Sequence, residues 1–194
     1  MSSELPSIAD LAAFLTDASN AERMSAFPTD PSRMLAPGVY TLWVDEAGRE
    51  QISRRLKADL PSLIYLGQAG ATRWPSGTPS DATLVSRIRG NHLRGRIRGS
   101  TFRYTLASIL LDDLTLRVEG SKVLTAESER SLSGWMERHL SVVAAPYDDA
   151  DRLQELDKEL LQLIDPPLNL NNVDPTPLRV RVRELRRRIQ YPAS

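Results

Sequence analysis

Hydrophobic and polar positions follow two periods along this chain, one typical of strands and one typical of helices. Segments rich in β-branched and aromatic residues predict strands at 37–44, 62–67 and 140–145. Apolar residues three and four positions apart predict helices at 7–18, 21–27, 81–91, 101–111, 125–139, 149–163 and 175–190. Between the first two strands, the polar residues predict a turn at 45–48 and a loop with a helical turn at 49–60.

This order of elements predicts an α+β fold. Parallel neighbours need a crossover of a dozen or more residues, so three short strands with brief links cannot all be parallel. We expect a small three-stranded, mainly antiparallel sheet flanked by helices. The chain divides into an N-terminal helical extension (1–36), a central domain (37–172) and a C-terminal basic helix (173–194) packed on that domain.

Composition excludes several classes of protein. The 194 residues contain no cysteine, which rules out disulfides, thiolate metal sites and cysteine nucleophiles. Only two histidines are present, so a His-rich zinc site is not expected. No apolar run approaches the roughly 20 residues that span a bilayer. Residues 1–10 lack a basic-then-apolar leader, and we expect a cytoplasmic protein.

The net charge of zero hides two arginine clusters. Only three of the 25 basic residues are lysine, and arginine binds phosphate through a planar fork that lysine lacks. Six arginines lie between Asp81 and Arg103, and six more between Arg179 and Arg188. Nucleic-acid phosphate is the expected partner of both clusters. The alternative is that they are solvated helix faces in a chain of arginine-rich composition.

A carboxylate occupies an unexpected position in the helix predicted at 149–163. At about 100° per residue, Asp157 falls inside the apolar stripe that includes Leu153, Leu156 and Leu160. A charge buried alone is costly, so Asp157 should either pair with an arginine at the edge of the stripe or bind a metal ion.

Two tripeptides on the first two predicted strands resemble the signature of the GIY-YIG nucleases. They are Gly38-Val39-Tyr40 and Tyr65-Leu66-Gly67. Downstream, Leu84-Val85-Ser86-Arg87 resembles the Leu-x-x-Arg pattern of the family's first helix, and His92 follows at a spacing seen in several members. The resemblance implies this family's fold over about Pro37–Asn172, with the C-terminal helix outside it.

The acidic residue and the asparagine of the family pattern also follow in order. Asp157 stands on a helix, and Asn169 follows the pair Pro166-Pro167. Two positions depart from the family: the acid is normally glutamate, and Gln68 stands where basic residues are frequent. The shorter acid puts metal affinity or rate in doubt but keeps the ligand type, because Mg²⁺ accepts either carboxylate.

The resemblance implies a metal-dependent endonuclease that hydrolyses DNA phosphodiester bonds. Asp157 would hold one Mg²⁺ or Mn²⁺ ion, Arg87 would neutralise the scissile phosphate, and Tyr40, assisted by Tyr65, would act as base or position the water. His92 and Asn169 complete the expected catalytic set. The expected DNA contacts are Gly67, Arg89, Arg94, Arg96, Arg98 and Arg103. No membrane partner is expected, and a homodimer is one assembly that the resemblance allows.

Each of these residues has a structural alternative. Tyr40 and Tyr65 could be core aromatics of the sheet, and Arg89 competes with Arg87 for the phosphate. His92 could be a surface residue or a phosphate contact, and Asn169 could brace the Pro-Pro turn. Trp74, in a Gly/Pro-rich loop, could stack on a base.

Two other functions remain open from sequence. A fold with the shortened acid could be a nucleic-acid-binding module that no longer cuts. The arginines could instead contact acidic proteins in a partner-binding role.

Overall fold

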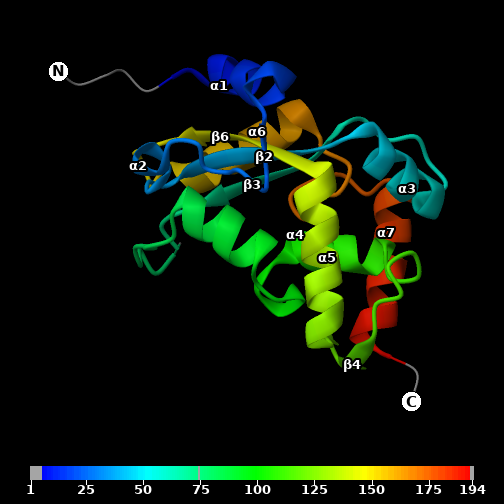
Figure 1. Cartoon of the computed structure of the whole chain (residues 1–194). Coiled ribbons are helices and arrows are strands. Elements are labelled where there is room, and N and C mark those ends of the chain that lie inside the picture. Colours follow the sequence, from blue (N-terminus) through cyan, green and yellow to red (C-terminus); the bar gives the residue numbers. More distant parts are fainter. Residues whose placement is uncertain (1–5, 74, 193–194) are drawn as a thin grey trace.

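A central sheet divides the molecule into two layers of helices (Figure 1). The computed structural model describes residues 6–73 and 75–192; Trp74 lies outside them. The sheet contains β1 (Glu22–Arg23), β2 (Gly38–Val44), β3 (Leu63–Ala69) and β6 (Leu140–Pro146), in the order β1-β6-β2-β3 with every pair antiparallel. The prediction of an antiparallel α+β fold is confirmed, but the sheet has four strands rather than three.

The remaining elements surround this sheet or form a small hairpin. They are α1 (Ile8–Thr16), η1 (Ala18–Asn20), α2 (Pro31–Met34), α3 (Glu46–Leu56), η2 (Ser86–Leu93), η3 (Ile97–Gly99), α4 (Thr101–Ile109), β4 (Val118–Gly120), β5 (Val123–Leu124), α5 (Ala126–His139), α6 (Leu153–Ile164) and α7 (Pro177–Gln190).

Alternation along β2 separates two hydrophobic cores. Val39 packs with the apolar faces of α1 and α6, which cover one face of the sheet. Tyr40, Leu42 and Val44 point to the opposite face, into the larger core shared with α3, α4, α5 and α7. Successive strand side chains point to opposite faces, so a single strand serves both cores.

Two predicted segments have a different structure. Residues 21–27 were expected to be helical, but Glu22 and Arg23 instead form β1 against Val142 and Ser141 of β6. The predicted turn and loop at 45–60 is mostly the helix α3. Asp45 caps this helix by accepting a hydrogen bond from the Gly48 N–H at 2.8 Å, a favourable N-cap that offsets the helix's polar composition.

The segment after α6 covers the free edge of β3. Leu168 N–H donates to the Ile64 carbonyl at 3.0 Å. The Asn169 amide then pairs with both backbone groups of Leu66, accepting from its N–H at 2.9 Å and donating to its carbonyl at 2.8 Å. The backbone N–H and carbonyl of Leu66 on this edge strand are therefore hydrogen-bonded to a side chain, at a position where another strand could otherwise pair.

The C-terminal helix α7 packs on α4 through Val182, Leu185 and Ile189. The division of the chain at residues 36 and 172 stays a prediction. None of the described helices is long and apolar enough to cross a membrane.

Candidate active site

A pocket of about 230 Å³ lies beside β3 and contains the chemically distinctive side chains of the sequence pattern. Its walls include Tyr40, Tyr65, Arg87, His92, Asp157 and Asn169. These residues come from β2, β3, η2, α6 and the segment that follows α6, so both helical layers contribute. The structure brings together all five residues expected to be catalytic, with the expected metal ligand.

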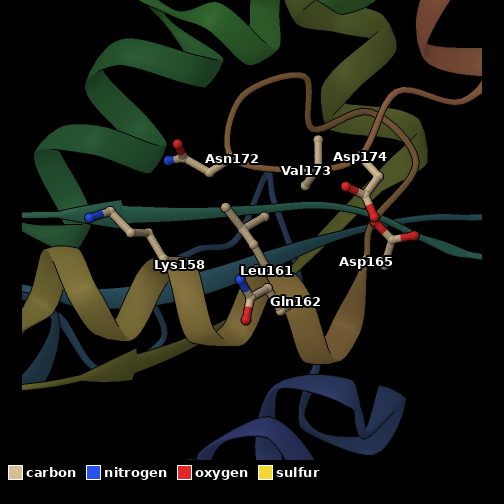
Figure 2. Close-up of a pocket in the computed structure, with 7 residues that line it drawn as sticks. All are labelled: Lys158, Leu161, Gln162, Asp165, Asn172, Val173 and Asp174. Atoms are coloured by element: carbon tan, nitrogen blue, oxygen red, sulfur yellow. The ribbon is translucent and has the colours of Figure 1, made fainter.

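A larger hollow of about 630 Å³ adjoins this pocket and shares Leu161 and Asn172 with it. Figure 2 shows Lys158, Leu161 and Gln162 of α6 on one side of this hollow and residues 172–174 on the other. Among the described residues that line it there is no tyrosine, histidine or arginine. The smaller pocket therefore contains the side chains that could take part in acid–base or phosphate chemistry, and the larger hollow is open space next to it.

The glycines of the two tripeptides make room for neighbouring backbone and for the ring of Tyr40. A Cβ on Gly38 would overlap the carbonyl oxygen of Ala145 on β6. Gly67 lies opposite Tyr40 in the β2–β3 register, and a Cβ there would overlap the Tyr40 hydroxyl. Gly67 lines the pocket, and the close approach that it permits among the described residues is that of the Tyr40 ring. Its contact with DNA stays a prediction.

Tyr40 and His92 form a buried hydrogen-bonded pair. The Tyr40 hydroxyl lies 2.5 Å from His92 Nε2, and His92 Nδ1 lies 2.6 Å from the Ser100 hydroxyl oxygen. Burial, with the neighbouring Tyr65, raises the pKa of Tyr40 well above its ordinary value, while Arg87 opposes the rise. Burial together with Arg87 and Arg103 lowers the pKa of His92 to about 3, so the imidazole is neutral at physiological pH.

His92 is thus not a surface residue, because only 2% of its surface is exposed. Its contact with a phosphate stays a prediction. Ser100 also caps α4, accepting a hydrogen bond from the Arg103 N–H at 3.0 Å, and the sequence did not predict its contact with His92. Nothing in the spacing of two residues eight positions apart reveals that contact.

A π-helix places Arg87 and His92 on the same wall of the pocket. The predicted α-helix at 81–91 instead begins at Leu84 and continues as η2, a π-helix. Thr83 and Ser86 cap its start reciprocally, which explains why residues 81–83 stay outside. Five residues apart, two side chains would diverge by roughly 140° on an α-helix. The i to i+5 bonding of a π-helix stacks them instead.

Arg87 presents an unused donor to the site. Its Nε is buried and has no hydrogen-bond partner among the described residues. Burying a donor without a partner costs about 1–3 kcal/mol, so such a group in a pocket wall favours an anionic ligand. Arg89 does not line the pocket, and the geometry supports the choice of Arg87 over Arg89.

Asp157 is partly buried, and in the described part of the chain its carboxylate makes no hydrogen bond or ion pair. The expected alternative of an arginine partner is therefore wrong. Burial raises the pKa of this carboxyl to about 6, and Lys158 opposes the rise. The described residues contain no cluster of three or more His, Cys, Asp or Glu side chains that could enclose a metal ion.

Asn169 lines the pocket, and its side chain forms two hydrogen bonds with the backbone of β3. Its amide oxygen and nitrogen are both used by Leu66, as described above, so its side chain positions the edge strand that carries Tyr65 and Gly67. The side chain therefore braces the strand, while the Asn169 N–H donates to the Pro166 carbonyl at 3.3 Å across the Pro-Pro turn.

Arg103 is not a DNA contact. Its side chain is completely buried, donates to the carbonyls of His92 and Leu93 at 3.0 and 2.9 Å, and pairs with Glu129 at 2.8 Å. It holds the C-terminal end of η2 and so the position of His92. Arg94, Arg96 and Arg98 are exposed, and with the half-buried Arg89 their contact with DNA stays a prediction.

Tyrosines of β2 and β3, an arginine and a histidine of η2 and an acid of α6 line one pocket, an arrangement that fits a catalytic domain of the nuclease class. A family model described as the GIY-YIG catalytic domain matches residues 38–188, and the chain belongs to that family. The family resemblance is confirmed, and the match extends into α7. No curated protein and no solved structure matches the chain significantly.

Proposed function

We propose that the protein is a divalent-metal-dependent endonuclease that hydrolyses DNA phosphodiester bonds in the pocket beside β3. The observation that carries this proposal is the convergence of Tyr40, Arg87, His92 and Asp157 on one pocket. Hydrolysis of a phosphodiester needs positive charge at the phosphate, an aligned water and a proton acceptor. These four side chains can provide the positive charge and the proton acceptor, and they can position the water and a metal ion.

Asp157 is the residue that would hold the metal ion. An unpaired, partly buried carboxylate fits a cation, and Mg²⁺ typically binds one or two carboxylates and keeps several waters. Once bound, Mg²⁺ or Mn²⁺ supplies positive charge that stabilises the phosphate and the leaving oxygen. A single ion is expected, because Asp157 is the one acidic side chain among the described residues of the pocket wall.

Tyr40 and His92 handle the proton of the attacking water. Among the described residues the Tyr40 hydroxyl has only His92 Nε2 as a partner, so the phenol donates its proton there and its oxygen can accept from a water. Passing that proton to His92 would let Tyr40 act as a base. Substrate phosphate beside Arg87 would counter the positive charge that helps to depress the pKa of His92, which favours this transfer.

Replacing Arg87 by alanine is expected to lower cleavage of supercoiled plasmid by about 10²–10³-fold, because one preorganised charge at the phosphate is lost. Nicking in Mg²⁺ or Mn²⁺ measures the effect, and Arg89→Ala is the matched control on the same helix. Equal cleavage by wild type and Arg87→Ala would remove Arg87 from the mechanism. No cleavage by the wild type in either metal would remove the nuclease proposal.

The shortened acid favours a second candidate, a weakened or inactive nucleic-acid-binding module. Asp157→Glu restores the family's usual side chain and discriminates between the two. A gain in nicking of at least about tenfold, roughly 1.4 kcal/mol at the transition state, is expected if reach limits the metal site. Loss of activity would indicate a site already adapted to aspartate. DNA binding without cleavage in both forms would support the binding module.

A cytoplasmic location and a homodimer stay predictions. So does the choice of DNA over other phosphodiesters, since the family match describes a catalytic domain and not its substrate.

A further inference from the structure

The six arginines of α7 fall into two groups. Three form ion pairs within the protein: Arg179 is buried and donates to Asp165 at 2.6 Å, Arg188 pairs with Asp112 at 2.7 Å, and Arg181 pairs with Glu184 at 3.3 Å. The other three, Arg183, Arg186 and Arg187, form no ion pair with any residue that the structure describes. Their charge is therefore not neutralised by the protein.

These three arginines share one helix face. Positions 183, 186, 187 and 190 are spaced three and four apart, which places them side by side on a helix. Together with Gln190 they line a hollow of about 300 Å³. We call Arg183, Arg186 and Arg187 the α7 arginine face.

The α7 arginine face adjoins the catalytic pocket. Arg183 donates to the Leu170 carbonyl at 2.6 Å, and Leu170 lines the pocket. Burial, with the charge of Asp157, raises the pKa of Tyr65 to about 12, and Arg87 and Arg186 are the two arginines that oppose the rise. Because Arg183 contacts Leu170, an anion bound on this face would lie next to the wall of the pocket that contains Arg87.

Arg186 is preorganised for such an anion. Its guanidinium lies 4.3 Å from the centre of the Tyr104 ring, and the Tyr104 hydroxyl donates to the Arg186 carbonyl at 2.6 Å. Lys122 Nζ lies 5.6 Å from the centre of the same ring and adds a further positive charge. Stacking fixes the guanidinium plane and leaves its N–H edge available for a phosphate.

We propose that the α7 arginine face binds the phosphate backbone of the DNA flanking the scissile bond. This inference rests on the proposed nuclease function and adds the surface that holds the substrate outside the pocket. Helix α7 thereby belongs to the substrate-binding surface rather than being only a structural extension. The face recognises charge and not base sequence, since phosphate contacts position a duplex without reading it.

Binding of a short fluorescent duplex to the full chain, measured by anisotropy in EDTA over a range of salt, tests the interface without cleavage. Arg183→Gln/Arg187→Gln is compared with the charge-matched control Arg138→Gln/Arg181→Gln. Counterion release predicts about 8-fold weaker binding per lost contact near 0.1 M salt, hence about 60-fold for the double variant, and a salt slope shallower by about 2. The control should bind within about 2-fold of the wild type.

Arg187→Gln alone guards against loss of folding, because the Arg187 side chain makes no hydrogen bond in the described chain; about 8-fold weaker binding is expected. Equal binding by both double variants, with plasmid cleavage by the wild type intact, would overturn the interface and leave the nuclease proposal standing. A wild type that neither binds nor cuts DNA at low salt would overturn both.

Discussion

Replacing Asp157 by asparagine is expected to lower DNA cleavage by at least about 10³-fold and to stabilise the metal-free protein above about pH 6. Cleavage falls because the amide is a poor ligand for Mg²⁺, whose contribution to the transition state is several kcal/mol. Stability rises because burial disfavours the Asp157 carboxylate and raises its pKa from 3.8 to about 6. The carboxylate that we propose as the metal ligand therefore lowers the stability of the folded protein when no metal is bound.

The direction of the pH dependence follows from that pKa. The folded pKa lies above the unfolded one, so the contribution of Asp157 to stability is fully present below about pH 4 and is lost as the pH rises through about 6. Because Asp157 is only partly buried and Lys158 is near, we expect a loss of about 1–2 kcal/mol. Thermal melts in EDTA at pH 4, 6 and 8 should show this loss of stability with rising pH in the wild type and not in Asp157→Asn.

The control for this experiment is Glu159→Gln, an exposed acid on the same helix, which should follow the wild type. Added Mg²⁺ should raise the Tm of the wild type at pH 8, because an ion that binds the folded state stabilises it. The Tm of Asp157→Asn should not change, because this variant lacks the proposed ligand. Parallel pH curves for the wild type and Asp157→Asn, together with equal responses to Mg²⁺, would contradict the assignment of Asp157 as metal ligand.

Replacing Arg103 by methionine is expected to lower the free energy of unfolding by about 3–5 kcal/mol. The change leaves the Glu129 carboxylate without its buried partner and frees the carbonyls of His92 and Leu93. For a chain of this size that loss corresponds to a fall in Tm of roughly 10 °C. Urea denaturation measures it.

Arg181→Met provides the comparison for Arg103→Met, because its ion pair with Glu184 is exposed and should contribute less than about 1 kcal/mol. If the free energy of unfolding falls no further in Arg103→Met than in Arg181→Met, the buried ion pair does not contribute to the stability of the domain as predicted. The variant should also impair cleavage under conditions where it is still folded, because Arg103 positions the end of η2 that carries His92.

Hydrophobic patterning predicted β2, β3 and α6, which carry Tyr40, Tyr65 and Asp157, because each of these elements has a clear apolar pattern. The strands β2, β3 and β6 are apolar and β-branched, and α6 has an apolar stripe that only Asp157 interrupts. The fold class and the family are confirmed. The chemical roles of Tyr40, Tyr65, Arg87, His92, Asp157 and Asn169 stay predictions that the variants above would test.

The features that sequence did not reveal depend on long-range contacts or on rare geometry. Arg103 could not be distinguished from an exposed arginine, because its partner Glu129 lies 26 positions away. Helix α3 has only a few apolar residues and depends on the Asp45 cap. The π-helix η2 leaves no periodic signal of its own, although it is what brings Arg87 and His92 onto one wall.

The clamp between Asn169 and Leu66 also limits how copies of the chain can associate. Because the backbone of Leu66 is already paired with Asn169 and that of Ile64 with Leu168, a second molecule cannot extend the sheet at β3 without first peeling this segment away. Peeling it away would withdraw Asn169 and Leu170 from the pocket wall. Self-association by strand exchange at this edge and a competent pocket are therefore mutually exclusive states of the same molecule.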